Sequence, residues 1–340
     1  MVDLLESRYV KQILFQPIGE KGQDKISGST VTIIGLGALG TVSSSHLCRA
    51  GVGRLKLVDR DFVETSNLQR QLLFDEKDAE LSLPKAVAAE EKLKLTNSAV
   101  TIESLVADVN PRNIESIIEE SDLVIDGTDN LETRFLINDA CLKNNMPWIY
   151  AAVLGSAGML MTIVPDQTPC LRCYIDQLPP AGTIASCDTE GVLSMTTGTV
   201  ASLQCAEALR LLTGFKPTPG ILYLDVWDRN FDSFNIERRP DCPACGEGCY
   251  EFLDGAGFSW TTILCGRNAV QIVPPAEKKV DLKMLENRLK KAGSVSFNGF
   301  LLSFKTEKHE IILFPNGRAI VRGTTDQAEA RNLYARHIGT

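Results

Sequence analysis

A glycine-rich turn between a strand and a helix constrains the fold of this chain more than any other feature. Gly35, Gly37 and Gly40 have the spacing GxGxxG; they follow the apolar run 30–34 and open a helical stretch that ends near Gly51. Glycines let a backbone approach a phosphate closely, and a helix N-terminus presents free N–H groups and partial positive charge. The next strand-like run ends at Asp59, where a carboxylate can bind ribose hydroxyls. Taken alone, the segment predicts a nucleotide-binding βαβ unit and favours a dehydrogenase that binds NAD.

Strands and helices alternate through most of the chain. Strand-like runs occupy 100–109, 122–130, 147–153 and 158–165, and residues 196–213 read as one long helix. This alternation predicts an α/β fold with a doubly wound, mainly parallel, Rossmann-like sheet. After Cys249, short strands with Asn-Gly hairpin turns and two helical stretches predict a small α+β domain. We therefore expect two domains, residues 1–249 and residues 250–340.

Composition narrows the function classes. The chain has 340 residues, a net charge of −8, 44% hydrophobic residues and 23% charged residues, which is normal for a soluble globular protein. Its acidic balance argues against a partner that is nucleic acid or an anionic membrane. The longest apolar stretch, 149–164, is interrupted by small and polar residues, and the N-terminus lacks the pattern of a signal peptide. We therefore expect a cytoplasmic protein.

Charged residues around the glycine turn do not suit a hydride-transfer enzyme. Asp61 follows Asp59, Arg70 lies in Ser66–Gln71, Lys85 opens a helix after Pro84, and Asp129 follows the strand 123–125. The carboxyl ends of the strands meet at one edge of a doubly wound sheet, so these acids are expected to face one crevice. Cations balance phosphate charge, and Mg²⁺ takes oxygen ligands. The set therefore favours ATP with Mg²⁺ over a dinucleotide.

Six sequence motifs together resemble the ThiF/MoeB family. They are GLGALG, VDRDFVETSNLQRQ, PKA, DGTDN, a pair of CxxC motifs and the cysteine of SCDTEGV, and the resemblance covers about residues 5–250. Members of this family adenylate the C-terminal carboxylate of ubiquitin-like sulfur-carrier proteins, in molybdopterin or thiamine-thiazole biosynthesis. The resemblance does not separate these two pathways.

The resemblance implies roles for individual residues. The ATP-binding loop is Gly35, Gly37, Ala38 and Gly40; Asp59 and Asp61 hold the ribose; Asn67, Arg70 and Lys85 contact phosphates; Asp129 binds Mg²⁺; and Asn130 lies beside the nucleotide. Catalysis is then expected mainly from positioning and from charge neutralisation by Arg70, Lys85 and the metal at Asp129.

The N-terminal motif departs from the family pattern. Relatives carry RYxRQ, whose second arginine reaches the ATP site of a neighbouring subunit, whereas this chain has Arg8-Tyr9-Val10-Lys11-Gln12. The resemblance therefore implies a homodimer, with Lys11 and Arg8 acting in trans. Lysine keeps the charge but loses the bidentate fork of arginine. A solvated surface lysine is the alternative for Lys11.

Two CxxC pairs predict a metal site. Cys170 and Cys173 form one pair, and Cys242 and Cys245 form the other. Four thiolates satisfy the tetrahedral geometry of a closed, structural Zn²⁺ site, a zinc knuckle within the larger domain. A redox role for one CxxC and a DNA-binding zinc ribbon are the less favoured alternatives.

Cys187 is a separate candidate, because it lies in a polar stretch between the first CxxC and the long helix. It aligns with a cysteine that some relatives use to bind the carrier covalently, although adenylation needs no cysteine. The alternatives are therefore a catalytic nucleophile and a spectator thiol. Cys48, Cys141 and Cys205 are expected in the core.

Two functions of other classes remain open. An NAD-dependent oxidoreductase would use Asp59 but would leave Lys85 and Asp129 without a task. A non-catalytic scaffold that binds nucleotide or carrier is the other alternative. In the C-terminal domain, basic residues could form a surface for an acidic carrier, or could be ordinary solvated side chains: Lys283, Arg288, Lys290, Lys291, Arg318 and Arg322.

Overall fold

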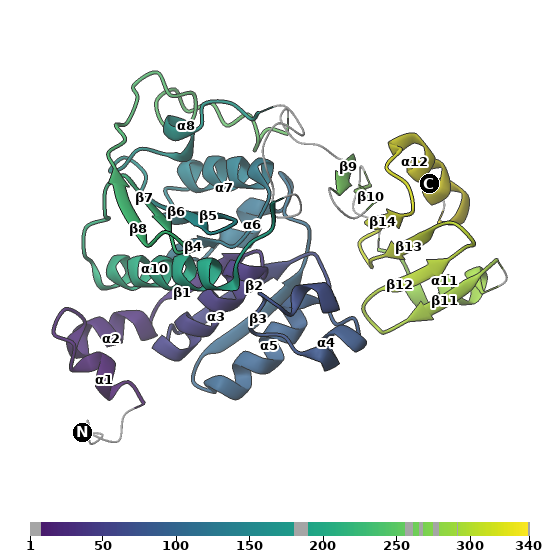
Figure 1. The fold of residues 1–340 in the computed structure, drawn as a ribbon, viewed down its shortest axis with the longest axis horizontal. Coiled ribbons are helices and arrows are strands. Elements are labelled where there is room, and N and C mark those ends of the chain that lie inside the picture. Colours follow the sequence, from purple (N-terminus) through teal and green to yellow (C-terminus); the bar gives the residue numbers. More distant parts are fainter. Residues whose placement is uncertain are drawn as a thin grey trace. The chain divides into compact units, whose positions relative to one another are not determined.

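The chain divides into two compact units, Met1–Phe258 and Ser259–Thr340. The computed structural model describes residues 8–179, 190–255, 261–264, 268–274, 279–290 and 292–338. Each unit has its own sheet and its own hydrophobic core (Figure 1). Among the described residues, no helix combines the length and the apolar character that a bilayer span requires.

The first unit is built on an eight-stranded sheet with the order β3-β2-β1-β4-β5-β6-β7-β8. Strands β1 to β5 run parallel, and β6, β7 and β8 continue the sheet antiparallel, which confirms the doubly wound, mainly parallel fold. The strands are β1 Thr30–Ile34, β2 Arg54–Asp59, β3 Thr101–Val106, β4 Leu123–Asp126, β5 Trp148–Leu154, β6 Ala157–Ile163, β7 Ile221–Asp225 and β8 Asn230–Phe234.

Helices cover both faces of this sheet. They are α1 Val10–Ile13, α2 Gly19–Ser27, α3 Ala38–Ala50, α4 Glu76–Glu80, α5 Lys85–Thr96, α6 Ile114–Ile118, α7 Leu131–Lys143, α8 Leu171–Tyr174 and α10 Ser194–Thr213, with a short 3₁₀ turn η2 at Thr65–Asn67. The long helix α10 ends at Gly214, which adopts the left-handed conformation expected of its cap.

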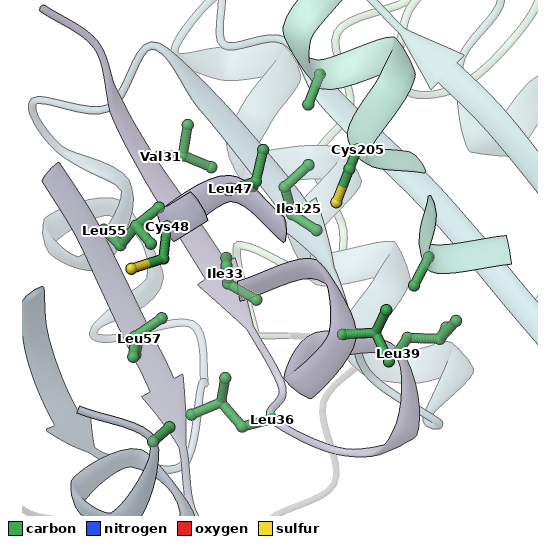
Figure 2. Packing of buried hydrophobic residues seen from close by; sticks show 14 of the residues in the cluster. Val31, Ile33, Leu36, Leu39, Leu47, Cys48, Leu55, Leu57, Ile125 and Cys205 are labelled. Carbon is green, nitrogen blue, oxygen red and sulfur yellow. The ribbon is translucent and has the colours of Figure 1, made fainter. Parts of the chain in front are cut away.

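Strand side chains alternate between the two faces. Val31 and Ile33 join a core with α3, α5 and α10, whereas Ile34 joins a second core with α6, α7 and α8. Figure 2 shows the first core, where Cys48 and Cys205 lie among the aliphatic side chains of β1, β2 and α3. Cys141 is equally buried in the second core, so the three cysteines are core residues as predicted.

Register places the strand ends that matter for function side by side. Ile34 of β1 pairs with Val58 of β2 and with Asp126 of β4. The residues that follow these three strands therefore leave the sheet at one edge. From β1 the strand order continues to β2 and β3 on one side, and from β4 to β5 on the other, so the topological switch point lies between β1 and β4. In doubly wound sheets nucleotides bind at this point.

The second unit is a six-stranded antiparallel sheet with the order β11-β12-β13-β14-β10-β9. Its elements are β9 Thr261–Leu264, β10 Ala269–Ile272, α11 Leu282–Leu289, β11 Ser294–Phe297, β12 Leu302–Lys305, β13 Glu310–Leu313, β14 Ala319–Arg322 and α12 Gln327–His337. Apolar side chains of both helices and of the sheet share one core. The unit is α+β, and its hairpin glycines Gly299 and Gly317 have positive φ.

Two expectations about this part of the chain need correction. Residues 250–255 belong to the first unit rather than the second, because Phe252 stacks on Phe135 of α7 with ring centroids 4.9 Å apart. The basic surface is smaller than expected, because Arg318 is 1% exposed and its guanidinium covers the ring of Phe314. Lys291 lies outside the described residues.

Candidate active site

Three glycines allow close backbone packing between the loop after β1 and the loop after β4 at the edge of the sheet. Gly35 has a φ of +90°, and its N–H donates to the Val58 carbonyl over 2.8 Å. A Cβ on Gly40 would lie 1.9 Å from the Gly35 carbonyl oxygen, and a Cβ on Gly127 would lie 2.3 Å from the same atom. Gly37 differs, because among the described residues a Cβ there would meet only one atom, at 3.7 Å. The missing side chain of Gly37 therefore leaves room for a ligand rather than for the protein.

Asp59 fixes the glycine loop to the end of β2. Its carboxylate accepts N–H groups from Leu36 over 2.6 Å and from Asp61 over 2.7 Å. Burial raises the pKa of the Asp59 carboxyl, and the charge of Lys85 offsets part of that rise. Each carboxylate oxygen keeps a second lone pair, so the residue can still accept a ribose hydroxyl.

Lys85 brings a buried cation to the same place. It begins α5, its side chain is 5% exposed, and its Nζ lies 3.8 Å from Asp61 Oδ2. Its backbone N–H donates to the Asp61 carbonyl over 2.9 Å, which ties α5 to the end of β2. The ion pair is longer than a hydrogen bond, so the ammonium can still donate to an anion such as a phosphate.

Arg60 is a crevice residue that the sequence analysis missed. Its Nη1 donates to Asp108 Oδ1 over 2.8 Å, and its Nε lies 4.0 Å from Asp61 Oδ1. Burial works against the charge of Arg60, but the carboxylates of Asp108, Asp61 and Asp129 more than offset this and raise its pKa. These interactions bring the loops after β2, β3 and β4 together. A basic residue between two acids was the available signal, but the partner Asp108 lies far along the chain.

Asn67 and Arg70 lie in the turn after β2. Asn67 is 2% exposed, and its Oδ1 accepts the Glu64 N–H over 3.1 Å in a capping box around η2. Only the NH₂ group of Asn67 is thus left for a phosphate. Arg70 Nη1 donates to the Ser66 carbonyl over 3.0 Å, which leaves the rest of its guanidinium available.

The loop after β4 presents one exposed acid. Asp129 is exposed, whereas Asp126, three residues earlier, is completely buried. Asn130, which sequence analysis placed beside the nucleotide, is the N-cap of α7: its Oδ1 accepts the N–H groups of Glu132 over 2.8 Å and of Thr133 over 3.3 Å. Asn130 therefore has a structural task, and Asp129 is the carboxylate that a metal could use.

The N-terminal motif lies at the other end of α3. Gln12 Nε2 donates to the Ala50 carbonyl over 2.9 Å, and Arg8 Nη1 donates to the Thr96 carbonyl over 2.9 Å, at the C-terminal ends of α3 and α5. Helix α3 begins at the glycine loop and has 13 residues, a length of about 20 Å. Lys11 is exposed in this region. One chain thus does not bring Arg8 and Lys11 to its own crevice.

Four cysteines form a cluster elsewhere in the first unit. Cys170 Sγ lies 3.6 Å from Cys242 Sγ, Cys173 Sγ lies 3.4 Å from Cys245 Sγ, and all four sulfurs lie within 4.8 Å of one another. Tetrahedral Zn²⁺ with bonds of about 2.3 Å would separate its sulfurs by about 3.8 Å. The donor set and its spacing therefore fit a zinc site. Cys187 lies outside the described residues.

Comparisons with known proteins agree with this geometry. A sequence model of the ThiF family matches residues 9–244. A sulfur carrier protein ThiS adenylyltransferase of Bacillus subtilis is 42% identical over 338 residues, which cover 98% of this chain and 100% of that protein. The ThiS adenylyltransferase of Escherichia coli is 38% identical over 242 residues, which cover 70% of this chain and 94% of that protein.

Solved structures show the same fold. Escherichia coli MccB with ATP matches with a TM-score of 0.63 and 22% identity, over 72% of this chain and 76% of that chain. At this identity the match shows the fold of the first unit alone.

Proposed function

Because the chain belongs to the ThiF family, we propose that it is an adenylyltransferase that uses ATP to activate the C-terminal carboxylate of a ubiquitin-like sulfur-carrier protein. A carboxylate oxygen of the carrier attacks the α-phosphorus of ATP, the bond to the β-phosphate breaks, and pyrophosphate leaves. The product is a carrier acyl-adenylate. The observation that carries this proposal is the buried Lys85 ammonium beside Asp61, at the sheet edge where the exposed Asp129 follows β4. A triphosphate with a metal needs both groups, whereas NAD needs neither.

Each crevice residue has a task in this reaction. Gly37 admits the phosphates, Asp59 accepts the ribose, and Lys85 and Arg70 donate to phosphate oxygens. Asp129 would hold Mg²⁺, which supplies charge neutralisation on the phosphates. These groups act by positioning and by electrostatics, because the attacking carboxylate is already ionised at neutral pH.

Removal of the Asp129 carboxylate tests this assignment. We expect Asp129→Ala to lower carrier-dependent ATP–pyrophosphate exchange by about 10²–10³-fold, with little change in thermal stability, because the side chain is exposed. The matched control is Glu119→Ala, which removes an exposed carboxylate before the opposite end of β4 and should leave exchange unchanged. Full exchange in Asp129→Ala would refute the site. Titration with NAD and with ATP tests the oxidoreductase alternative.

A second copy of the chain completes the site in this proposal. Lys11 is exposed and lies at the end of α3 remote from the glycine loop, so a contribution to ATP binding has to come in trans. Lys11→Ala and Asp129→Ala should each be inactive alone. Their mixture should regain activity, because one site of the mixed dimer has the native Asp129 of one chain and the native Lys11 of the other. Absence of complementation in a confirmed mixed dimer would contradict the trans contribution.

The carrier and the role of Cys187 complete the proposal. The correspondence with the Bacillus subtilis protein extends over both units and favours a ThiS-type carrier over one for molybdopterin synthesis. Exchange measured with each carrier tests this choice. In a later step, the Cys187 thiolate would attack the carbonyl of the acyl-adenylate and displace AMP. Cys187→Ser should then keep ATP–pyrophosphate exchange but lose a thiol-sensitive adduct with the carrier. If the variant keeps both the exchange and the adduct, Cys187 is a spectator thiol.

The second unit lies outside the adenylation reaction in this proposal. The alignment with the Escherichia coli enzyme needs 242 residues, fewer than the first unit contains. The zinc site is assigned a structural role, because four cysteine ligands leave no open position for a substrate. Cytoplasmic location stays a prediction; a reducing compartment keeps such thiols available for metal.

A further inference from the structure

We propose that Arg134 is a positioning residue for the adenylation site: it sets the conformation of the loop Asp126–Asn130 and thereby the place of the Asp129 carboxylate. This inference rests on the proposed function. Arg134 lies in the first turn of α7 and is 8% exposed. Its Nε donates to Asp126 Oδ2 over 2.9 Å, and Asp126 is completely buried at the end of β4.

The other arm of the guanidinium joins the loop to the neighbouring strand. Arg134 Nη2 donates to the Thr128 carbonyl over 2.5 Å and to the Ala151 carbonyl of β5 over 2.8 Å. The guanidinium also lies over the Tyr150 ring, 5.2 Å from its centroid. A planar group with donors in fixed directions is needed to make these contacts at once, and lysine does not have one.

Asp126 holds the same loop from its other oxygen. Its Oδ1 accepts the Thr128 N–H over 2.8 Å and the Thr128 hydroxyl over 2.7 Å. Thr128 is therefore fixed at its N–H, its side chain and its carbonyl. Asp129 is the next residue, so its carboxylate is presented from a backbone that is held on both sides.

A buried amide extends this network to α10 and α3. Gln204 is completely buried, and its Nε2 donates to the Asp126 carbonyl over 2.8 Å and to the Ile149 carbonyl over 2.9 Å. Its Oε1 accepts the Ser43 hydroxyl over 3.0 Å. The glycine contact between Gly127 and Gly35 adds a direct link to the phosphate loop.

Stability alone is a weak reason for this arrangement. Burying an ion pair costs desolvation energy, and apolar residues of similar volume often stabilise a fold as well or better. The Asp126–Arg134 pair also fixes the orientation of the loop backbone, because it binds the N–H and the carbonyl of Thr128. The next residue in this loop is the exposed Asp129. A group required for geometry should affect metal affinity, and a group required only for folding should not.

Substitution by lysine tests this difference. Arg134→Lys keeps the charge beside Asp126 but cannot hold Asp126, Thr128 and Ala151 together. We expect the half-saturating Mg²⁺ concentration for exchange to rise about tenfold, as for the loss of a charge-assisted hydrogen bond. The affinity for Mn²⁺ in the presence of ATP, measured by electron paramagnetic resonance without carrier, should fall by the same factor.

Controls separate positioning from folding. Arg318→Lys changes another buried arginine that lies over an aromatic ring, in the second unit, and should leave Mn²⁺ affinity unchanged. Thr128→Val removes only the hydroxyl bond to Asp126 and should weaken Mn²⁺ binding about threefold, which decides the case if Arg134→Lys does not fold.

Wild-type Mn²⁺ affinity in folded Arg134→Lys, or in Thr128→Val where Arg134→Lys is unfolded, overturns the inference. Equal Mn²⁺ affinity in wild type and Asp129→Ala refutes the metal assignment of the proposed function itself. These results are distinguishable, because the second comparison leaves Arg134 untouched.

Discussion

Disruption of the cysteine cluster should destabilise the first unit by a predictable amount. The cluster joins residues 72 apart in the chain, Cys170 with Cys242 and Cys173 with Cys245. If bound Zn²⁺ acts as a cross-link that closes a loop of this length, the chain-entropy relation gives about 4 kcal/mol of stabilisation. In a unit of about 250 residues, each kcal/mol shifts Tm by about 2–4 °C. Cys242→Ser should therefore lower Tm by roughly 8–16 °C.

Thermal unfolding with a parallel zinc assay measures this effect. Zinc content would be determined by mass spectrometry, with an expected stoichiometry of one per chain that falls in Cys242→Ser. The control is Cys249→Ser, since Cys249 is exposed, follows the cluster closely and is not part of it. The control should keep both zinc and Tm. Chelation of the wild type should reproduce the shift of Cys242→Ser.

The same variant tests the structural role of the metal. Below its lowered Tm, Cys242→Ser should bind ATP as the wild type does, because none of the crevice contacts involves a cysteine of the cluster. A Tm within about 2 °C of the wild type in zinc-free protein would refute the cross-link reasoning. Loss of ATP binding by folded, zinc-free protein would refute the purely structural role.

Three further predictions follow from particular contacts. Gly40→Ala should weaken ATP binding about tenfold or more, because the new Cβ would lie 1.9 Å from the Gly35 carbonyl oxygen. Gly198→Ala in α10 is the control: the space around its new Cβ is open, so this variant should bind ATP normally in the same titration. Burial raises the pKa of the Asp139 carboxyl to about 6, so the folded state holds more protons than the unfolded state above about pH 4. The free energy of unfolding should then fall by up to about 3 kcal/mol as pH rises to about 6, and denaturant titrations of Asp139→Asn should lack this decline. A chain that ends at residue 258 keeps the crevice and the cysteine cluster, so calorimetry should show ATP binding and metal analysis should show zinc; loss of either would mean that the first unit needs the second.

Local patterns were sufficient to predict the mainly parallel architecture of the first unit, although strands β7 and β8 were not predicted. The central parallel strands β4 and β5 are mainly apolar runs, β2 and β3 mix apolar and polar residues, and the switch point follows from the order of these elements. The glycine loop, Asp59 and Asp129 lie at strand ends on one edge of the sheet, and Lys85 joins them from the start of α5 through its ion pair with Asp61. The cysteine cluster was predictable for a similar reason, since CxxC spacing is a local property.

Pairings between distant segments were not predictable. Arg60 meets Asp108 from 48 residues away, and Gln204 meets the Asp126 carbonyl from 78 residues away. No periodicity or local spacing encodes such contacts. The N-cap role of Asn130 was missed for a different reason: an asparagine directly before a helix is a normal N-cap signal, but the family motif drew attention to a nucleotide contact, which stays a prediction. The predicted domain boundary differs from the observed one because no sequence pattern around Phe252 assigns it to the first unit. Only its stacking on Phe135 places it there.

The charge balance of the crevice explains why one chain is not expected to complete the site. Asp59, Asp61, Asp108 and Asp129 bring four carboxylates, against which Lys85 and Arg60 are already partly committed. ATP adds several more negative charges, which Mg²⁺ and Arg70 offset only in part. Further positive charge has to come from outside the chain's own crevice. The proposed contribution of Lys11 in trans would supply this charge, because Lys11 is exposed and lies at the end of α3 remote from its own glycine loop.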